Sequence, residues 1–181
     1  MRRTLAILVE NRTGELARIV GLFSARGYNI ENLSVAETLD PGISRVTLVT
    51  NGDDAMAEQI IKQLEKQIRV LSATDLTVID HIEREMVLVH VNAEAENARL
   101  EVTKLASIFD AKVIDKSEDG VTVEAVAEGH KVDALLRSLQ PFGIREVARG
   151  RLAIGRLPVS YPQITQITET TESQLKIVVP V

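Results

Sequence analysis

The stretch from Glu10 to Val35 constrains the fold more than any other part of the sequence. Its apolar residues recur at the spacing of one helix face, namely Leu16, Ile19, Val20 and Phe23. Thr13 suits the N-cap of that helix, and Gly27 suits a left-handed residue at its end. Beyond Gly27 the residues alternate like a strand. This stretch predicts a loop, an amphipathic helix and a returning strand.

The first eighty residues extend this unit into a β-α-β-β-α-β order. Apolar runs and alternation predict strands at Leu5–Val9, around Leu33, at Ser44–Thr50 and at Val70–Ile79. A second helical stripe lies between the last two strands, at Ala57, Ile60, Ile61 and Leu64. This order is the ferredoxin-like split βαβ arrangement.

The same order then repeats. We expect strands at Met86–Val91, Ala111–Asp115, Val121–Val126 and Ile144–Ala153, with helical stripes that begin at Val102 and Val132. The fold class is therefore α+β, with two ferredoxin-like βαββαβ domains and antiparallel sheets. The expected domains are 1–80 and 81–157, joined around Asp80–Glu85, where Glu83, Arg84 and Glu85 suggest a solvated junction or a contact with a partner. Pro158, Pro162 and many threonines predict a mobile tail over 158–181.

Composition excludes several classes of function. Hydrophobic residues make up 45% and charged residues 26%, as in globular proteins. The net charge of -5 argues against nucleic acid and anionic membranes as partners. The absence of cysteine excludes disulfides and thiolate chemistry. The apolar run that ends at Val9 is too short for a signal core or a membrane span, so we expect a cytoplasmic protein.

We find no catalytic or metal-binding constellation in the sequence. His81, His90 and His130 lie far apart without metal-ligand spacing. No phosphate-binding loop, dinucleotide fingerprint or nucleophile elbow occurs. The chain is therefore not expected to be an enzyme by itself or to bind a metal.

The two ends of the first helix are candidates for binding a small molecule. A helix N-terminus presents unpaired N–H groups that suit a carboxylate, and Gly14 would let a ligand approach the backbone. Asn11 and Asn29 could hydrogen-bond both an ammonium group and a carboxylate. These residues are equally typical of plain turns, so the pattern leaves both interpretations open.

Longer sequence matches point to a family. The order strand, N-x-x-G-x-L, helix, R-G-Y-N-I, strand resembles an ACT domain, an amino-acid-sensing module, although many ACT domains carry proline at the position of Thr13. The sequence more closely resembles the small regulatory subunit of acetohydroxyacid synthase. This resemblance rests on M-R-R-T-L, G-L-F-S-A-R-G-Y-N-I-E-N-L-S-V, D-P-G-I-S-R, I-E-R-E-M and R-E-V-A-R-G, which extend to about Arg156.

The resemblance implies a regulatory role. The chain would activate a catalytic large subunit and confer feedback inhibition by valine, with isoleucine or leucine as other candidates. Thiamine diphosphate, magnesium and FAD would belong to that partner, and the chain would itself form a homodimer. A stand-alone amino-acid sensor and an enzyme with an undetected site are the alternatives.

The resemblance also implies a valine site in the first domain. Its residues would be Asn11, Thr13, Gly14, Glu15, Leu16, Asn29 and Ile30, with the two segments supplied by different chains. The second domain has no equivalent of N-x-x-G, so we expect no such site there.

Overall fold

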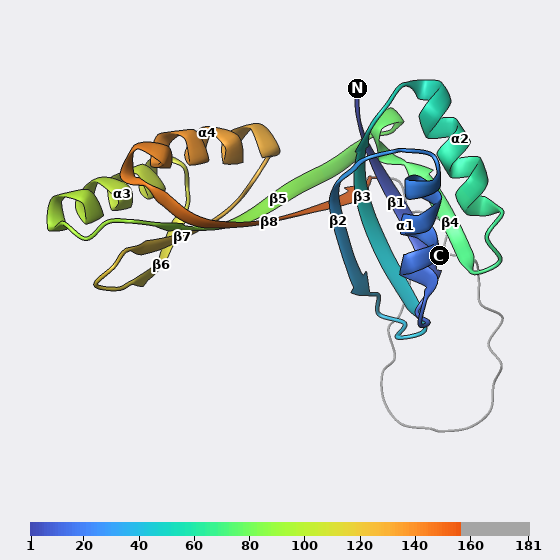
Figure 1. Cartoon of the computed structure of the whole chain (residues 1–181), viewed down its shortest axis with the longest axis horizontal. Coiled ribbons are helices and arrows are strands. Elements are labelled where there is room, and N and C mark those ends of the chain that lie inside the picture. The colour runs from blue at the N-terminus through green and yellow to red at the C-terminus, as the bar shows by residue number, and fades with distance from the viewer. Residues whose placement is uncertain (157–181) are drawn as a thin grey trace.

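Residues 1–156 are described by the computed structural model, and they form two lobes (Figure 1). The first lobe contains β1 (Arg2–Glu10), α1 (Glu15–Ala25), β2 (Ile30–Glu37), β3 (Ile43–Asn51), α2 (Asp54–Glu65) and β4 (Val70–Asp75). Its sheet has the order β2-β3-β1-β4, with antiparallel neighbours. The predicted βαββαβ order is confirmed.

The second lobe repeats this arrangement. It contains β5 (His81–Val91), α3 (Glu96–Ile108), β6 (Lys112–Lys116), β7 (Val121–Ala127), α4 (Gly129–Leu139) and β8 (Ile144–Gly155). The sheet order β6-β7-β5-β8 is again antiparallel. Short 3-10 turns at Leu76–Val78 and Gln140–Phe142 precede β5 and β8. The α+β class predicted from the repeat is therefore confirmed. No helix among residues 1–156 is long and apolar enough to cross a bilayer.

Each sheet buries one face against its own two helices. In the first lobe, Leu5, Ile7 and Val9 of β1 point toward α1 and α2, where Ile19 and Phe23 are fully buried. Alternate strand residues share a face, so the residues between them lie on the side without helices. In the second lobe the same alternation places Val87, Val89 and Val91 against α3 and α4. Burial of such side chains is the main favourable term in folding.

The prediction that Glu83, Arg84 and Glu85 form a solvated junction is wrong. Residues 81–85 are not a solvated loop, because β5 begins at His81 rather than at Met86. The predicted fourth strand is also too long, since β4 ends at Asp75 and a 3-10 turn follows. Two long strands thus connect the lobes, and we call residues 81–85 of β5 with 151–155 of β8 the ribbon (Figure 1).

The ribbon packs against the helix-free face of the first sheet. Ala153 of β8 lies in a small buried cluster with Ala6 of β1 and Leu76. The Arg45 guanidinium of β3 donates a hydrogen bond of 2.8 Å to the Ala153 carbonyl oxygen. These contacts hold the two lobes together. The predicted tail, 158–181, lies outside the described residues.

Candidate functional site

The loop before α1 leaves the start of the helix uncapped. Gly14, and not Thr13, is the N-cap residue, so the predicted Thr13 cap is wrong. Gly14 has φ 92°, which a residue with a Cβ rarely adopts, and no side chain caps the helix. The N–H groups of Leu16 and Ala17 find no acceptor among residues 1–156. An anion could therefore approach this exposed helix terminus.

Asn11 holds the loop in place with its amide nitrogen. Its Nδ2 donates to the Glu37 carboxylate and to the Pro41 carbonyl oxygen, each at 2.9 Å. Its backbone N–H donates to the Gly42 carbonyl oxygen. Both amide hydrogens are then used, so only Oδ1 remains to accept a hydrogen bond from a ligand ammonium group.

Glu15 has a structural role in this geometry. Its side chain is buried and forms ion pairs with Arg18 at 2.9 Å and Arg69 at 3.1 Å. The carboxylate thereby ties the first turn of α1 to the chain just before β4. Leu16 follows with a 39% exposed side chain beside the loop.

Asn29 and Ile30 lie at the opposite end of α1. This helix has 11 residues, so the two ends are separated by about 16 Å. The Asn29 carbonyl oxygen accepts a hydrogen bond of 2.6 Å from the Thr50 hydroxyl, and Ile30 packs against the core. One chain therefore does not bring Asn29 and Ile30 to the loop. A site made from both segments requires two chains.

A buried charge cluster at the base of the ribbon was missed by the sequence analysis. The Glu85 carboxylate is buried and accepts hydrogen bonds from Arg149 through Oε1 and from Arg151 through Oε2. A Cβ at Gly129, the first residue of α4, would lie 2.9 Å from the Arg151 guanidinium, so glycine leaves room for this pair. The hydrogen bond to Glu85 raises the pKa of Arg149 against the opposing effect of burial, and Asp133 adds to the rise.

Glu83 continues the cluster into the first lobe. It accepts hydrogen bonds from Arg151 at 2.8 Å, from Arg2 at 2.9 Å and from the Thr4 hydroxyl at 2.8 Å. The signal in the sequence was the alternation of Glu83 and Glu85 with apolar Ile82 and Met86, which is typical of a strand. The charges had instead suggested a loop.

Two family models cover most of the chain. The model described as "AHAS small subunit-like ACT domain" matches residues 5–72. The model described as "Small subunit of acetolactate synthase" matches residues 84–157. The matched segments fall on the first and second lobes respectively.

Proteins that match most of this chain come from several organisms. The acetolactate synthase small subunit of Aquifex aeolicus is 44% identical over 156 residues, which cover 86% of this chain and 81% of that protein. A probable acetolactate synthase small subunit of Methanothermobacter thermautotrophicus is 43% identical over 153 residues, or 84% of this chain and 91% of that one. The crystal structure of the acetolactate synthase small subunit from Thermotoga maritima superposes with a TM-score of 0.78 at 34% identity, covering 88% and 99% of the two chains.

Proposed function

Because this chain belongs to the family of acetolactate synthase small subunits, we propose that it activates a catalytic large subunit and makes it sensitive to valine. The enzyme activity resides in the large subunit, together with thiamine diphosphate, magnesium and FAD. The chain acts in the cytoplasm, in branched-chain amino-acid biosynthesis. It binds neither nucleic acid nor a membrane.

The observation that carries the proposal is the uncapped start of α1. A ligand carboxylate can accept hydrogen bonds from the N–H groups of Leu16 and Ala17, next to Gly14, where no side chain intervenes. The Asn11 Oδ1 atom can accept from the ligand ammonium group. Together these groups match the two charged ends of an amino acid.

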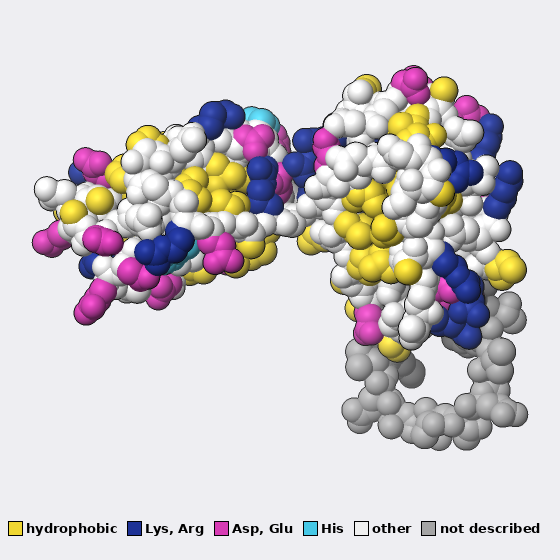
Figure 2. Space-filling model, in the orientation of Figure 1, with side chains coloured by type: hydrophobic (Ala, Val, Ile, Leu, Met, Phe, Trp, Pro, Cys, Tyr) yellow, Lys and Arg dark blue, Asp and Glu magenta, His cyan; other side chains and the backbone are white. Residues whose placement is uncertain are grey.

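The complete valine site lies between two chains. The loop Asn11–Leu16 of one protomer faces Asn29 and Ile30 of its partner, since α1 separates these segments within one chain. The open edge of the first sheet at β2 offers a surface for such pairing. Hydrophobic side chains also gather on the face of the first lobe where α1 and β2 lie (Figure 2).

The two domains have different roles in this proposal. The domain 1–80 senses the amino acid, because it alone carries the N-x-x-G loop. The domain 81–157 contributes to activation of the large subunit, with residues 145–151 of β8 at the contact. Valine can regulate the complex only if it binds one arrangement of the subunits more tightly than another.

Reconstitution tests this proposal against its rivals. The purified chain is mixed with the purified large subunit, and acetolactate formation from pyruvate is measured with and without valine. We expect the chain to raise the activity of the large subunit, and valine to reduce it. The chain alone should form no acetolactate.

Two results would select a rival. Failure of the large subunit to co-purify with the chain, at micromolar concentrations of both, would favour a stand-alone amino-acid sensor. Acetolactate formation by the chain alone would favour an enzyme with its own site.

A further inference from the structure

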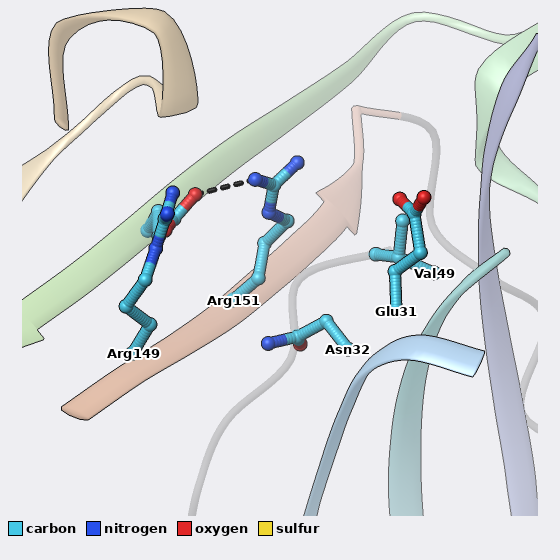
Figure 3. Close-up of a pocket in the computed structure, with 6 residues that line it drawn as sticks. Glu31, Asn32, Val49, Arg149 and Arg151 are labelled. Atoms are coloured by element: carbon cyan, nitrogen blue, oxygen red, sulfur yellow. Dashed lines mark hydrogen bonds and ion pairs between the residues drawn. The ribbon is translucent and has the colours of Figure 1, made fainter. Parts of the chain in front are cut away.

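A hollow of about 290 Å³ lies between the first lobe and the β5–β8 pair (Figure 3). Its lining residues are Glu31, Asn32 and Val49 from the first lobe and Glu85, Arg149 and Arg151 from the second. Asn32 pairs with Val49 on the helix-free face of the first sheet, whereas Ile30 packs against the core on the helix side. The hollow is therefore separate from the valine site proposed above.

The side chains that line the two walls of the hollow differ in net charge: Glu85, Arg149 and Arg151 sum to one positive charge, and Glu31 carries one negative charge. On the second-lobe side, Arg149 and Arg151 keep the Nη1 and Nε nitrogens, respectively, without a partner among residues 1–156. Their remaining nitrogens are fixed by carboxylates, which orients both guanidinium groups before any ligand binds. On the first-lobe side, the Glu31 carboxylate accepts a hydrogen bond from the Asn51 amide and pairs with no cation among the described residues.

Asn32 adds an unsatisfied acceptor. Its Oδ1 atom is buried and has no hydrogen-bond partner in the described part of the chain. Such an atom costs free energy unless a ligand or water donates to it. In Figure 3 the Asn32 side chain lies below Arg151 and Glu31, with its amide nitrogen on the side of the arginines.

The charges select the class of ligand. The four ionised side chains of the lining, Glu31, Glu85, Arg149 and Arg151, sum to zero, which disfavours a simple anion or cation. A divalent metal would need free carboxylate oxygens, but both oxygens of Glu85 already accept from arginines. The volume corresponds to that of about ten water molecules in the liquid, enough for a small amino acid.

We propose that this hollow binds a free α-amino acid of small size. Its carboxylate accepts hydrogen bonds from Arg149 and Arg151, and its ammonium group donates to Glu31 and to the Asn32 Oδ1 atom. Since the walls belong to different lobes, the ligand favours the arrangement in which the lobes lie as they do here. The hollow would thus couple amino-acid concentration to the relative position of the two domains.

NMR titration of the full chain tests this inference. The probes are glycine and L-valine, with acetate and methylammonium as ligands that carry one charge only. We expect glycine or valine to shift the side-chain amide of Asn32 and the backbone amides of Val49 and Arg151. Each single-charge probe should bind at least about tenfold more weakly, because it uses only one wall.

Replacing Glu31 by a neutral residue tests whether its charge contributes to ligand binding. Glu31→Gln keeps an oxygen that can accept from Asn51 but loses the charge that attracts the ammonium group. It should raise the dissociation constant at the hollow about tenfold or more. Glu101→Gln, which changes an exposed carboxylate on α3, should leave the constant unchanged.

The outcomes separate this inference from the proposed valine site. Shifts confined to the amides of residues 11–16 would overturn the inference and leave the valine site standing. Shifts confined to Asn32, Val49 and Arg151 would support the inference and remove the valine site. Unchanged binding in Glu31→Gln, or acetate binding as tightly as glycine, would also overturn it.

Discussion

The buried Glu85 carboxylate lies between the guanidinium groups of Arg149 and Arg151. Its charge is stabilised only while both partners remain. Ionised groups lose hydration free energy on burial, and the Coulomb attraction with ideal hydrogen bonds offsets that loss. Arg151 is also largely buried and contacts two carboxylates, those of Glu83 and Glu85. The charged cluster is therefore sensitive to removal of its central member and tolerant of changes at its rim.

Glu85→Gln should destabilise the chain by about 2 kcal/mol, because Arg151 loses its buried carboxylate partner and keeps only the ion pair with the partly buried Glu83. Urea unfolding followed by circular dichroism measures this change. Asp133→Asn is the matched control, since Asp133 also pairs with Arg149 but is about half exposed, and should cost less than about 1 kcal/mol. If both variants lose the same free energy of unfolding, the buried Glu85 pair stabilises the chain no more than the exposed Asp133 pair does.

The same residues show where sequence reasoning reached its limit. Hydrophobic periodicity predicts which residues face a core, and it predicted the element order of both lobes. It cannot predict that Glu83 and Glu85 find cations on β8, because that pairing depends on register between distant strands. For the loop, Gly14 was recognised as a turn residue, but its left-handed N-cap conformation was visible only in the structure.

A polar contact links the β6–β7 hairpin to the start of β8. The Asp119 carboxylate accepts from the Ser117 hydroxyl at 2.6 Å and from the Arg145 guanidinium. These bonds, with Ser117 the larger cause, lower the pKa of Asp119 to about 2. Residues 117–120 and β8 are thereby linked across the second sheet.

This contact gives the hairpin a defined pH dependence. A carboxyl whose pKa is depressed in the folded state contributes stability above its unfolded pKa and loses it as pH falls toward the folded pKa. We therefore expect the hairpin to loosen between about pH 4 and pH 2, as read from NMR amide exchange in residues 117–120. Ser117→Ala should raise the pKa of Asp119, and Ser107→Ala on α3 should not. A pKa of Asp119 that is the same in wild type and Ser117→Ala would contradict this account.

We predict that two chains form a homodimer through their first lobes. Sedimentation equilibrium of the full chain should give about twice its mass of 19.9 kDa. Leu16→Glu should weaken the dimer and valine binding together, since Leu16 lies beside the loop that faces the partner. Leu100→Glu, at a 54% exposed position of α3 in the second lobe, should do neither. A monomer at micromolar concentration with valine present would exclude a site shared between chains.

The valine response of the reconstituted complex, compared between two substitutions at Gly14, tests whether the loop before α1 binds the regulatory amino acid. Asp and Asn have nearly the same shape and tolerate left-handed backbone, so Gly14→Asp and Gly14→Asn carry a similar cost of about 1 kcal/mol in stability. Only Asp places a negative charge beside the ligand carboxylate. That repulsion is on the order of 1–4 kcal/mol, which is roughly ten- to a thousandfold in affinity.

The measurement is the valine concentration that halves acetolactate formation by the large subunit with wild type, Gly14→Asn or Gly14→Asp. All three should activate the large subunit, because Gly14 lies in an exposed loop away from the ribbon and the second lobe. Gly14→Asn also adds a side chain beside the Leu16 and Ala17 N–H groups, so it should raise the valine concentration needed, but by less than Gly14→Asp, which should require roughly ten- to a thousandfold more valine than wild type. Inhibition of Gly14→Asp at the wild-type valine concentration would contradict the proposal that this loop binds the regulatory amino acid.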